Sequence, residues 1–450
     1  MLSLKNIKPL YAIIFHILIG LLAYVDRSLM VFYMLGILGY FIYSIILKNN
    51  KALYVLLAAA YITGVEVFLR MTKAFVFYET GKYAVMFFVL LGILYLGFKR
   101  NAISYIVYIL LLLPGVLVSL DAISYDANFR TTVLFNLSGP LCLSFAAIFC
   151  YGRTISLKNF LKVLDFIVYP LISTVVYITL YTPDIQEVVT GTASNAALSG
   201  GYGPNQVATI LGLGMFILFS RLLIPYKNII VQWCMMFLMI VMTYRALLTF
   251  SRGGVLISLI ISVVFIVIIY ISSSIKSKAK ITVKVLSLLG IALMVWSYTL
   301  VQTGGLIGNR YANEDALGRE KEDITTGRVD LLAVEIDAFK ENPIFGIGIG
   351  QGKFQFREEM GIISASHNEI SRMLSEHGLL GILALLILLI APMVTKMKGR
   401  KNIYFYPFLL FWGLTIVTTS MRIAAPAFIY ALCLLNIDYA PKKKPALHRK

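Results

Sequence analysis

The chain is short of charge, and acidic residues are the scarcer kind. Only 14% of its 450 residues are Asp, Glu, Lys or Arg, whereas soluble globular domains have about 25%. A soluble enzyme is therefore excluded. The 22 acidic residues stand against 40 basic ones, which gives a formal net charge of +18. In a soluble chain this excess would indicate a nucleic-acid partner, but here its distribution indicates a membrane, and no nucleic-acid partner is expected.

Cysteine is also rare, and every cysteine lies inside an apolar run. The four are Cys142, Cys150, Cys234 and Cys433. A thiol in such surroundings behaves as a small hydrophobic group. We therefore predict neither a disulfide nor a thiolate metal site, and we expect no cofactor.

The glycine-rich segment 342–354, Asn-Pro-Ile-Phe-Gly-Ile-Gly-Ile-Gly-Gln-Gly-Lys-Phe, lacks the spacing of a nucleotide-binding loop. In the P-loop pattern, Ile347 would stand at the first glycine and Phe354 at the hydroxyl residue. In the dinucleotide pattern, Gln351 or Lys353 would stand at the third glycine. The segment is better interpreted as a close-packed turn in which backbone approaches backbone.

Long apolar runs dominate the rest of the sequence. Apolar residues make up 59% of the chain and the mean hydropathy is +0.84. A helix that crosses a bilayer needs roughly 20 apolar residues. We therefore predict an all-α, polytopic integral membrane protein with about 12–14 transmembrane helices. The fourteen candidate spans lie near residues 9–25, 28–47, 51–69, 83–98, 102–120, 131–150, 159–181, 204–224, 228–249, 254–271, 281–300, 374–395, 403–419 and 422–437.

Basic residues gather in alternate connections between these spans. Cytoplasmic loops carry an excess of Lys and Arg, so these connections and the N-terminus are predicted to lie inside. The chain then divides into transmembrane helices 1–11 (1–300), an extracytoplasmic loop (301–366), and C-terminal helices with a basic cytoplasmic tail (367–450). The basic residues assigned to the inner side include Lys48, Lys51, Lys99, Arg100, Arg153, Lys158, Arg221, Lys227, Lys276, Lys284, Lys396, Lys401, Lys442, Lys443, Lys444, Arg449 and Lys450.

The long outer loop contains one predicted amphipathic helix. It begins at Thr326-Gly327-Arg328, and Pro343 ends it because the residue before a proline is pushed out of helical geometry. We expect this helix on or near the outer membrane surface. Its apolar residues recur at steps of three and four: Val329, Leu332, Ile336 and Phe339.

Three polar residues on the predicted outer side are chemical candidates. Arg252 follows Ser251 at a turn between spans, and an arginine at membrane depth needs a partner. It is either an interfacial anchor or a site for an anion, which the adjacent glycines would favour. Arg328 opens the surface helix, and alone it would be a solvated loop charge. His367 lies where the loop meets the next span, and a lone histidine is more often structural. His377, deeper in that span, is interpreted as structural.

Other charged residues have a simpler structural interpretation. Glu66 and Arg70 stand four apart at the outer end of a span and are predicted to pair. Two acidic pairs in the loop could bind a divalent cation, but a solvated face is favoured and no metal is expected. These pairs are Glu314 with Asp315 and Glu322 with Asp323.

Together these motifs resemble the O-antigen ligase and O-antigen polymerase superfamily of bacterial membrane glycosyltransferases. The resemblance covers about residues 200–395 and depends on the order and placement of short motifs around one outer loop. The motifs are Ser251-Arg252-Gly253-Gly254, Thr326-Gly327-Arg328, Asn342-Pro343-Ile344-Phe345-Gly346-Ile347-Gly348, His367-Asn368, and Leu374-Ser375-Glu376-His377-Gly378-Leu379-Leu380-Gly381.

The resemblance implies transfer of an oligo- or polysaccharide from a polyprenyl diphosphate carrier to an acceptor hydroxyl, without metal. It also implies multi-pass placement in the bacterial cytoplasmic (inner) membrane, with the active site on the extracytoplasmic side. Arginine forks suit diphosphate oxygens, and an imidazole suits a hydroxyl proton. The implied catalytic residues are His367, Arg252 and Arg328. The implied diphosphate-binding residues are Arg252, Arg328 and Arg245. The implied acceptor or supporting residues are Asn368, Glu369 and Asn205.

The acceptor stays open at this point. We favour a polymerase of O-antigen or exopolysaccharide, which acts on a carrier-linked repeat with a possible chain-length regulator as partner. A ligase would instead transfer the glycan to lipid A core in lipopolysaccharide biosynthesis, and a relative could transfer it to protein. From another class, a lipid-linked glycan flippase or transporter is the alternative, although such proteins need charges in several mid-membrane positions.

Overall fold

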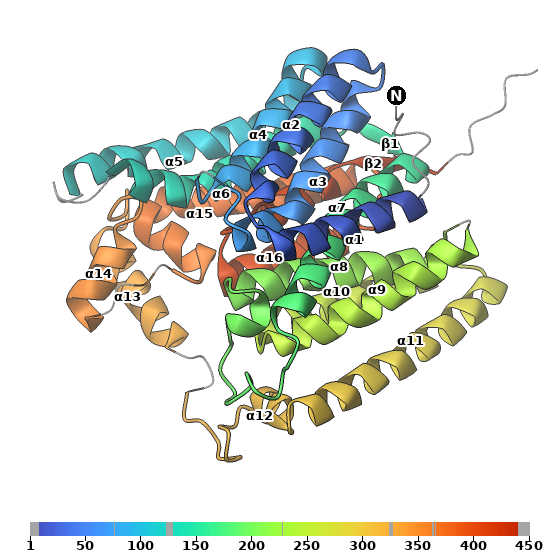
Figure 1. Ribbon diagram of the computed structural model, residues 1–450. Coiled ribbons are helices and arrows are strands. Elements are labelled where there is room, and N and C mark those ends of the chain that lie inside the picture. The colour runs from blue at the N-terminus through green and yellow to red at the C-terminus, as the bar shows by residue number, and fades with distance from the viewer. Residues whose placement is uncertain are drawn as a thin grey trace, which may run out of the picture.

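The computed structural model describes residues 9–75, 77–122, 129–226, 228–323, 327–361, 364 and 366–439. The basic tail and Thr326 lie outside these residues. The chain forms a helical bundle (Figure 1). Its helices and strands are α1 (Pro9–Val25), α2 (Leu29–Leu47), α3 (Lys51–Met71), α4 (Thr80–Leu96), η1 (Arg100–Ala102), α5 (Ile103–Ala122), α6 (Phe129–Cys150), β1 (Thr154–Ser156), α7 (Leu157–Tyr181), η2 (Ala197–Ser199), α8 (Pro204–Leu223), α9 (Ile229–Leu248), α10 (Arg252–Ile271), α11 (Ile275–Gln302), α12 (Leu306–Ala312), α13 (Arg328–Glu341), α14 (Gly352–Met360), α15 (Glu369–Met397), α16 (Phe405–Thr419), α17 (Ala424–Cys433) and β2 (Asn436–Asp438).

The prediction of an all-α, multi-pass membrane protein is confirmed. Within the described residues, ten helices are long and apolar enough to cross a membrane. The shorter apolar helices α1, α4, α16 and α17 coincide with the four other predicted spans. The four cysteines are free thiols, as expected.

Helix α3 lies in the centre of the bundle and packs against α7, while α17 is buried along its whole length. The crossing of α3 and α7 requires Gly64, because a Cβ there would lie 2.1 Å from the Ile167 carbonyl oxygen. Glu66 pairs with Arg70, as predicted, and also accepts a 2.6 Å hydrogen bond from the Ala424 N–H at the start of α17. A carboxylate suits a helix N-terminus, so this pair fixes one end of α17.

Two pairs of segments that are far apart in the sequence meet at the ends of the bundle. Strand β1 follows α6, β2 follows α17, and the two form a parallel pair, so these two connections meet at one end of the bundle (Figure 1). At the other end, Thr192 of the α7–α8 connection contacts the 301–323 segment through the Glu314 carbonyl and the Lys321 ammonium. In these two places, segments predicted to share a side of the membrane lie next to each other.

Helix α13 is present at the predicted position and ends just before Asn342 and Pro343. The face that packs on the protein is not the predicted apolar stripe. The stripe residues Val329 and Ile336 are exposed, and the helix packs on α15 with a different set of residues. The buried residues of α13 are Leu331, Val334, Glu335 and Ala338. The other two stripe residues, Leu332 and Phe339, are half-buried.

The glycine-rich segment after α13 is a close-packed turn, as predicted. It lies between α5 and a kink in α15 at Gly378. The Ile347 N–H donates to the Ser375 carbonyl at 2.8 Å and the Ile349 N–H donates to the Gly115 carbonyl at 3.2 Å. Gly346 has φ +72°, and a Cβ there would lie 2.5 Å from the backbone of α15. The glycines therefore serve backbone packing.

We expect Gly378→Ala to destabilise the protein strongly. Gly378 has φ +59°, and a Cβ there would lie 2.6 Å from the carbonyls of Pro343 and Ile344. Left-handed backbone alone costs a non-glycine residue about 1–3 kcal/mol, and the contact adds to it. The thermal unfolding midpoint of the purified protein should fall clearly. Gly290→Ala in α11 is the control, because nothing lies near its Cβ position; equal midpoints for the two variants would contradict the account.

Candidate functional site

The turn between α9 and α10 presents Arg252 at the first position of α10. The Arg252 guanidinium donates to the Arg310 carbonyl at 3.3 Å, and the Arg310 guanidinium donates to the Phe250 carbonyl at 2.9 Å. Below the turn, the Ser251 hydroxyl donates to the Asn205 side-chain oxygen at 2.8 Å. The turn and α12 thus hold each other, and Asn205 supports the turn.

The glycine after this turn has a structural reason. A Cβ at Gly254 would lie 2.0 Å from the Ala208 carbonyl oxygen, and one at Gly212 would lie 2.2 Å from the Gly254 carbonyl oxygen. Helices α8 and α10 therefore cross backbone to backbone. The suggestion that adjacent glycines admit an anion is wrong for Gly254, because the backbone of α8 occupies that space.

Four arginines, which we call the arginine cluster, converge near this turn: Arg252, Arg310, Arg328 and Arg422. Burial and then the charges of Arg252 and Arg328 lower the pKa of Arg310. Burial and the charge of Arg252 lower the pKa of Arg328. Burial, together with the charge of Arg328, lowers the pKa of Arg422, although neighbouring tyrosines act against this. Among the described residues, Arg310 and Arg328 have no carboxylate at ion-pair distance. The cluster is therefore a concentrated positive potential, which favours an anionic ligand.

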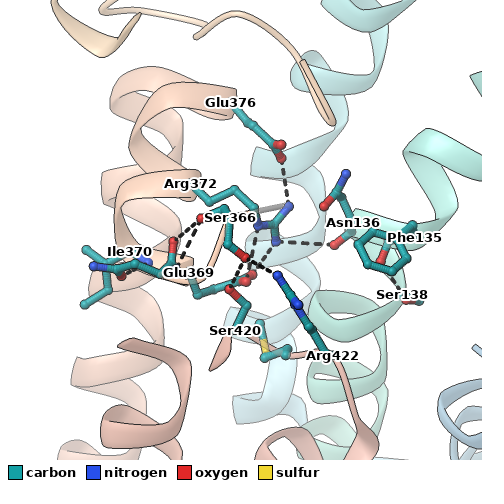
Figure 2. A network of polar contacts seen from close by, with 12 residues as sticks. Phe135, Asn136, Ser138, Ser366, Glu369, Ile370, Arg372, Glu376, Ser420 and Arg422 are labelled. Atoms are coloured by element: carbon teal, nitrogen blue, oxygen red, sulfur yellow. Dashed lines mark hydrogen bonds and ion pairs between the residues drawn. The ribbon is translucent and has the colours of Figure 1, made fainter. Parts of the chain in front are cut away.

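His367 is held beside this cluster by the turn that precedes α15. The Ser366 carbonyl accepts hydrogen bonds from the Arg422 guanidinium at 3.0 Å and the Ser420 hydroxyl at 3.2 Å (Figure 2). The Asn368 side chain accepts from the Ile370 N–H at 2.9 Å and caps α15. His367 is therefore placed by a fixed turn between α15 and the α16–α17 connection.

The surroundings of His367 keep its ring neutral. Burial, and then the charges of Arg422 and Arg328, lower its pKa to about 4. Its Nδ1 atom is buried and has no hydrogen-bond partner within the described part of the chain. A neutral imidazole with a free nitrogen can accept a hydrogen bond from a substrate.

A buried ion network lies behind the turn. Arg372 pairs with Glu369 and, at 2.7 Å, with Glu376, and it donates to the Asn136 carbonyl at 3.3 Å (Figure 2). The other Glu376 oxygen accepts the Gly350 N–H at 2.8 Å. Glu369, predicted as an acceptor or supporting residue, is thus a partner of Arg372. The network ties α15 to α6 and to the glycine-rich segment.

A cavity of about 130 Å³ opens between α13, the turn and α16. Arg328 and His367, two of the predicted catalytic residues, both line it, and Asn368 lies beside them. The lining residues are Arg328, Val329, Leu331, Leu332, Glu335, His367, Asn368 and Val417. The structure therefore brings Arg328, His367 and Asn368 into one site. Arg252 does not line the cavity, but its charge acts on Arg328.

Arg245 does not join this group in the structure. Its guanidinium donates to the Thr179 hydroxyl at 3.1 Å and lies near the carbonyls of Thr179 on α7 and of Thr182, which follows α7. In these contacts Arg245 ties α9 to the end of α7. His377 is buried against Gly115, as the structural interpretation requires.

Three residues of the site were not singled out by the sequence: Arg310, Arg422 and Glu335. Arg310 lies in a charged loop and Arg422 between two short apolar runs, so neither has a local motif. Glu335 lies on the surface helix among other acidic residues. Their positions beside Arg252, Arg328 and His367 arise only from tertiary packing.

No group of three metal-binding side chains occurs within the described residues. Of the acidic loop residues, Asp315 pairs with Arg319. A hydrogen bond from the Arg319 backbone N–H, followed by other contacts with that residue, lowers the Asp315 pKa. Glu314 and Asp315 are half-buried, whereas Glu322 and Asp323 are exposed, as a solvated face would be.

The fold and the site define a multi-pass membrane protein with a pocket beside a cluster of arginines. Residues 237–386 match the family model described as O-antigen ligase. This match supports the predicted resemblance to the O-antigen ligase and polymerase superfamily over one third of the chain. The match contains Arg252, Arg310, Arg328 and His367, whereas Arg422 lies beyond it. Among curated proteins, none matches the chain. The family indicates glycan transfer in surface polysaccharide assembly.

Proposed function

We propose that the protein transfers a glycan from a polyprenyl diphosphate carrier to an acceptor hydroxyl, without a metal ion. One observation carries the proposal: Arg252, Arg310 and Arg328 influence one another electrostatically beside a pocket that contains His367. Guanidinium groups bind phosphate oxygens through two parallel hydrogen bonds. Several of them can stabilise the charge that develops on a leaving diphosphate.

The donor and the acceptor occupy different sides of this site. Arg252 and Arg328 bind the carrier diphosphate, and Arg310 and Arg422 add to the positive field. His367 serves the acceptor, because its buried Nδ1 can accept the proton of an attacking hydroxyl. Bond formation to the anomeric carbon accompanies cleavage of its bond to the diphosphate, which leaves with the electron pair. Asn205 and Glu369 act as supports, through Ser251 and Arg372 respectively.

We propose polymerisation of carrier-linked repeats as the reaction, with a chain-length regulator as a possible partner, and attachment to lipid A core as the alternative. Deletion of the gene tests this proposal. Loss of a polymerase should leave glycans of a single repeat, whereas loss of a ligase should leave long glycans on the carrier and none on lipid A core. Unchanged carrier-linked glycans and unchanged surface polysaccharide would contradict both, and unmodified carrier-linked glycan trapped inside the cell would favour a flippase.

The active site is proposed to face outward from the bacterial inner membrane. Cysteines introduced at Glu341 and at Lys276, both exposed, should then label differently with a membrane-impermeant thiol reagent. In intact cells with a permeabilised outer membrane, we expect labelling at position 341 and none at 276. The wild-type chain controls for background from its native cysteines. Labelling at position 276 alone would reverse the orientation and remove the proposed chemistry from the side where the carrier-linked glycan is polymerised.

A further inference from the structure

The pocket contains two buried polar atoms that lack partners within the described residues. They are Nδ1 of His367 and Oε1 of Glu335. A buried polar atom without a hydrogen bond costs about 1–3 kcal/mol. Glu335 is only 3% exposed, so solvent does not readily compensate its oxygen. Two such atoms in one cavity point to a ligand that brings hydroxyl groups.

The Glu335 carboxylate is held in a fixed orientation. Its Oε2 accepts a hydrogen bond from the Ser371 hydroxyl of α15, while its buried Oε1 has no partner within the described residues. The charged and titratable groups that face it are Arg372, Glu369 and Glu376 of α15, Arg328 of its own helix, and His367. Burial raises the pKa of Glu335, while the hydroxyls of Ser371 and Ser366 and the charge of Arg372 oppose the shift.

The walls of the cavity differ in chemistry. The lining combines a carboxylate, an imidazole and a guanidinium, from Glu335, His367 and Arg328, with the apolar side chains of Val329, Leu331, Leu332 and Val417. A sugar ring has apolar C–H faces and hydroxyl groups around its edge, so its chemistry matches a lining that combines apolar and hydrogen-bonding side chains.

We propose that this cavity is the acceptor-sugar subsite, in which Glu335 Oε1 accepts a hydrogen bond from one hydroxyl while His367 Nδ1 receives the attacking hydroxyl. The inference deepens the proposed function and rests on it. Glu335 is thereby a specificity-determining residue that selects acceptors with a second, neighbouring hydroxyl. Its negative charge also favours a proton on His367 once the donor diphosphate has neutralised the nearby arginines.

The test compares acceptor and donor kinetics of full-length variants in proteoliposomes. The donor is the carrier-linked glycan from the deletion strain, and the acceptors are the carrier-linked repeat and the lipopolysaccharide from the same strain. The second readout is hydrolysis of the donor by water. Glu335→Gln should reduce kcat/KM for the acceptor by about 10- to 100-fold, as for loss of a hydrogen bond to a charged group. The loss should arise mainly as a higher acceptor KM. Donor hydrolysis should be unchanged.

Two matched variants separate this role from structural ones. Asp337→Asn removes an exposed carboxylate from the same helix and should leave the acceptor KM unchanged. Ser371→Ala removes the partner of Oε2 but leaves Oε1 in place, so its effect should be smaller than that of Glu335→Gln. Equal effects of Ser371→Ala and Glu335→Gln on the acceptor KM would overturn the inference. So would a parallel loss of donor hydrolysis in Glu335→Gln, or an acceptor KM that this variant leaves unchanged. Failure of the wild-type chain to consume the donor would instead overturn the proposed function, and the inference with it.

Discussion

His367→Ala is expected to slow glycan transfer by about 10² to 10⁴, the usual contribution of a general base, while binding of polyprenyl diphosphate stays nearly intact. The histidine lines the cavity, it is held by the Ser366 turn, and its buried Nδ1 has no hydrogen-bond partner within the described residues. Single-turnover transfer and donor binding should be measured on the same preparation. Equal loss of binding would place His367 in the diphosphate site, and full activity would return it to a structural role.

The pH dependence of kcat/KM gives a second measure of this histidine, because it reports groups of the free enzyme. The pKa of His367 lies at about 4 in the protein, below its ordinary value of about 6.5. The ring is therefore neutral above about pH 4, and activity should fall only as pH drops toward that value. A decline centred near pH 6.5 that disappears in His367→Ala would show that the nearby arginines do not act on the ring.

Arg252→Lys and Arg328→Lys should each reduce transfer by about 10² to 10³, as expected when one donor to a developing anion is lost. Lysine keeps the charge but cannot form the two parallel hydrogen bonds of a guanidinium. Rates should be compared at equal amounts of folded protein. Arg319→Lys is the control, because Arg319 lies in the same outer segment but is exposed and paired with Asp315. Near-normal transfer by both lysine variants would leave the diphosphate clamp without support.

The spans could be predicted closely from the sequence because apolar run length is a local property. For α1 the predicted limits agree with Pro9–Val25, and for the final span, 422–437, the helix is the shorter Ala424–Cys433. That span is buried within the protein rather than spread across a lipid layer. Hydropathy alone does not distinguish a buried apolar helix from a lipid-facing one.

The site was only partly predictable. Arg252, Arg328 and His367 stand beside recognisable turns, and both Arg328 and His367 do line one cavity. Arg422 holds the His367 turn from a position 55 residues further along the chain, a relation that no local pattern reports. The prediction that Gly254 admits an anion was also wrong, because the backbone of α8 packs directly against this glycine.

The most direct test of the account is the binding of polyprenyl diphosphate, without its glycan, to the full-length protein in lipid vesicles. The wild-type chain should bind it, and Arg252→Ala and Arg328→Ala should each weaken binding by at least about tenfold, as loss of a charged hydrogen bond of 1.5–3 kcal/mol predicts. Arg319→Ala should bind like the wild type. Equal binding by all four proteins, or none by the wild type, would contradict the claim that the arginine cluster holds the donor.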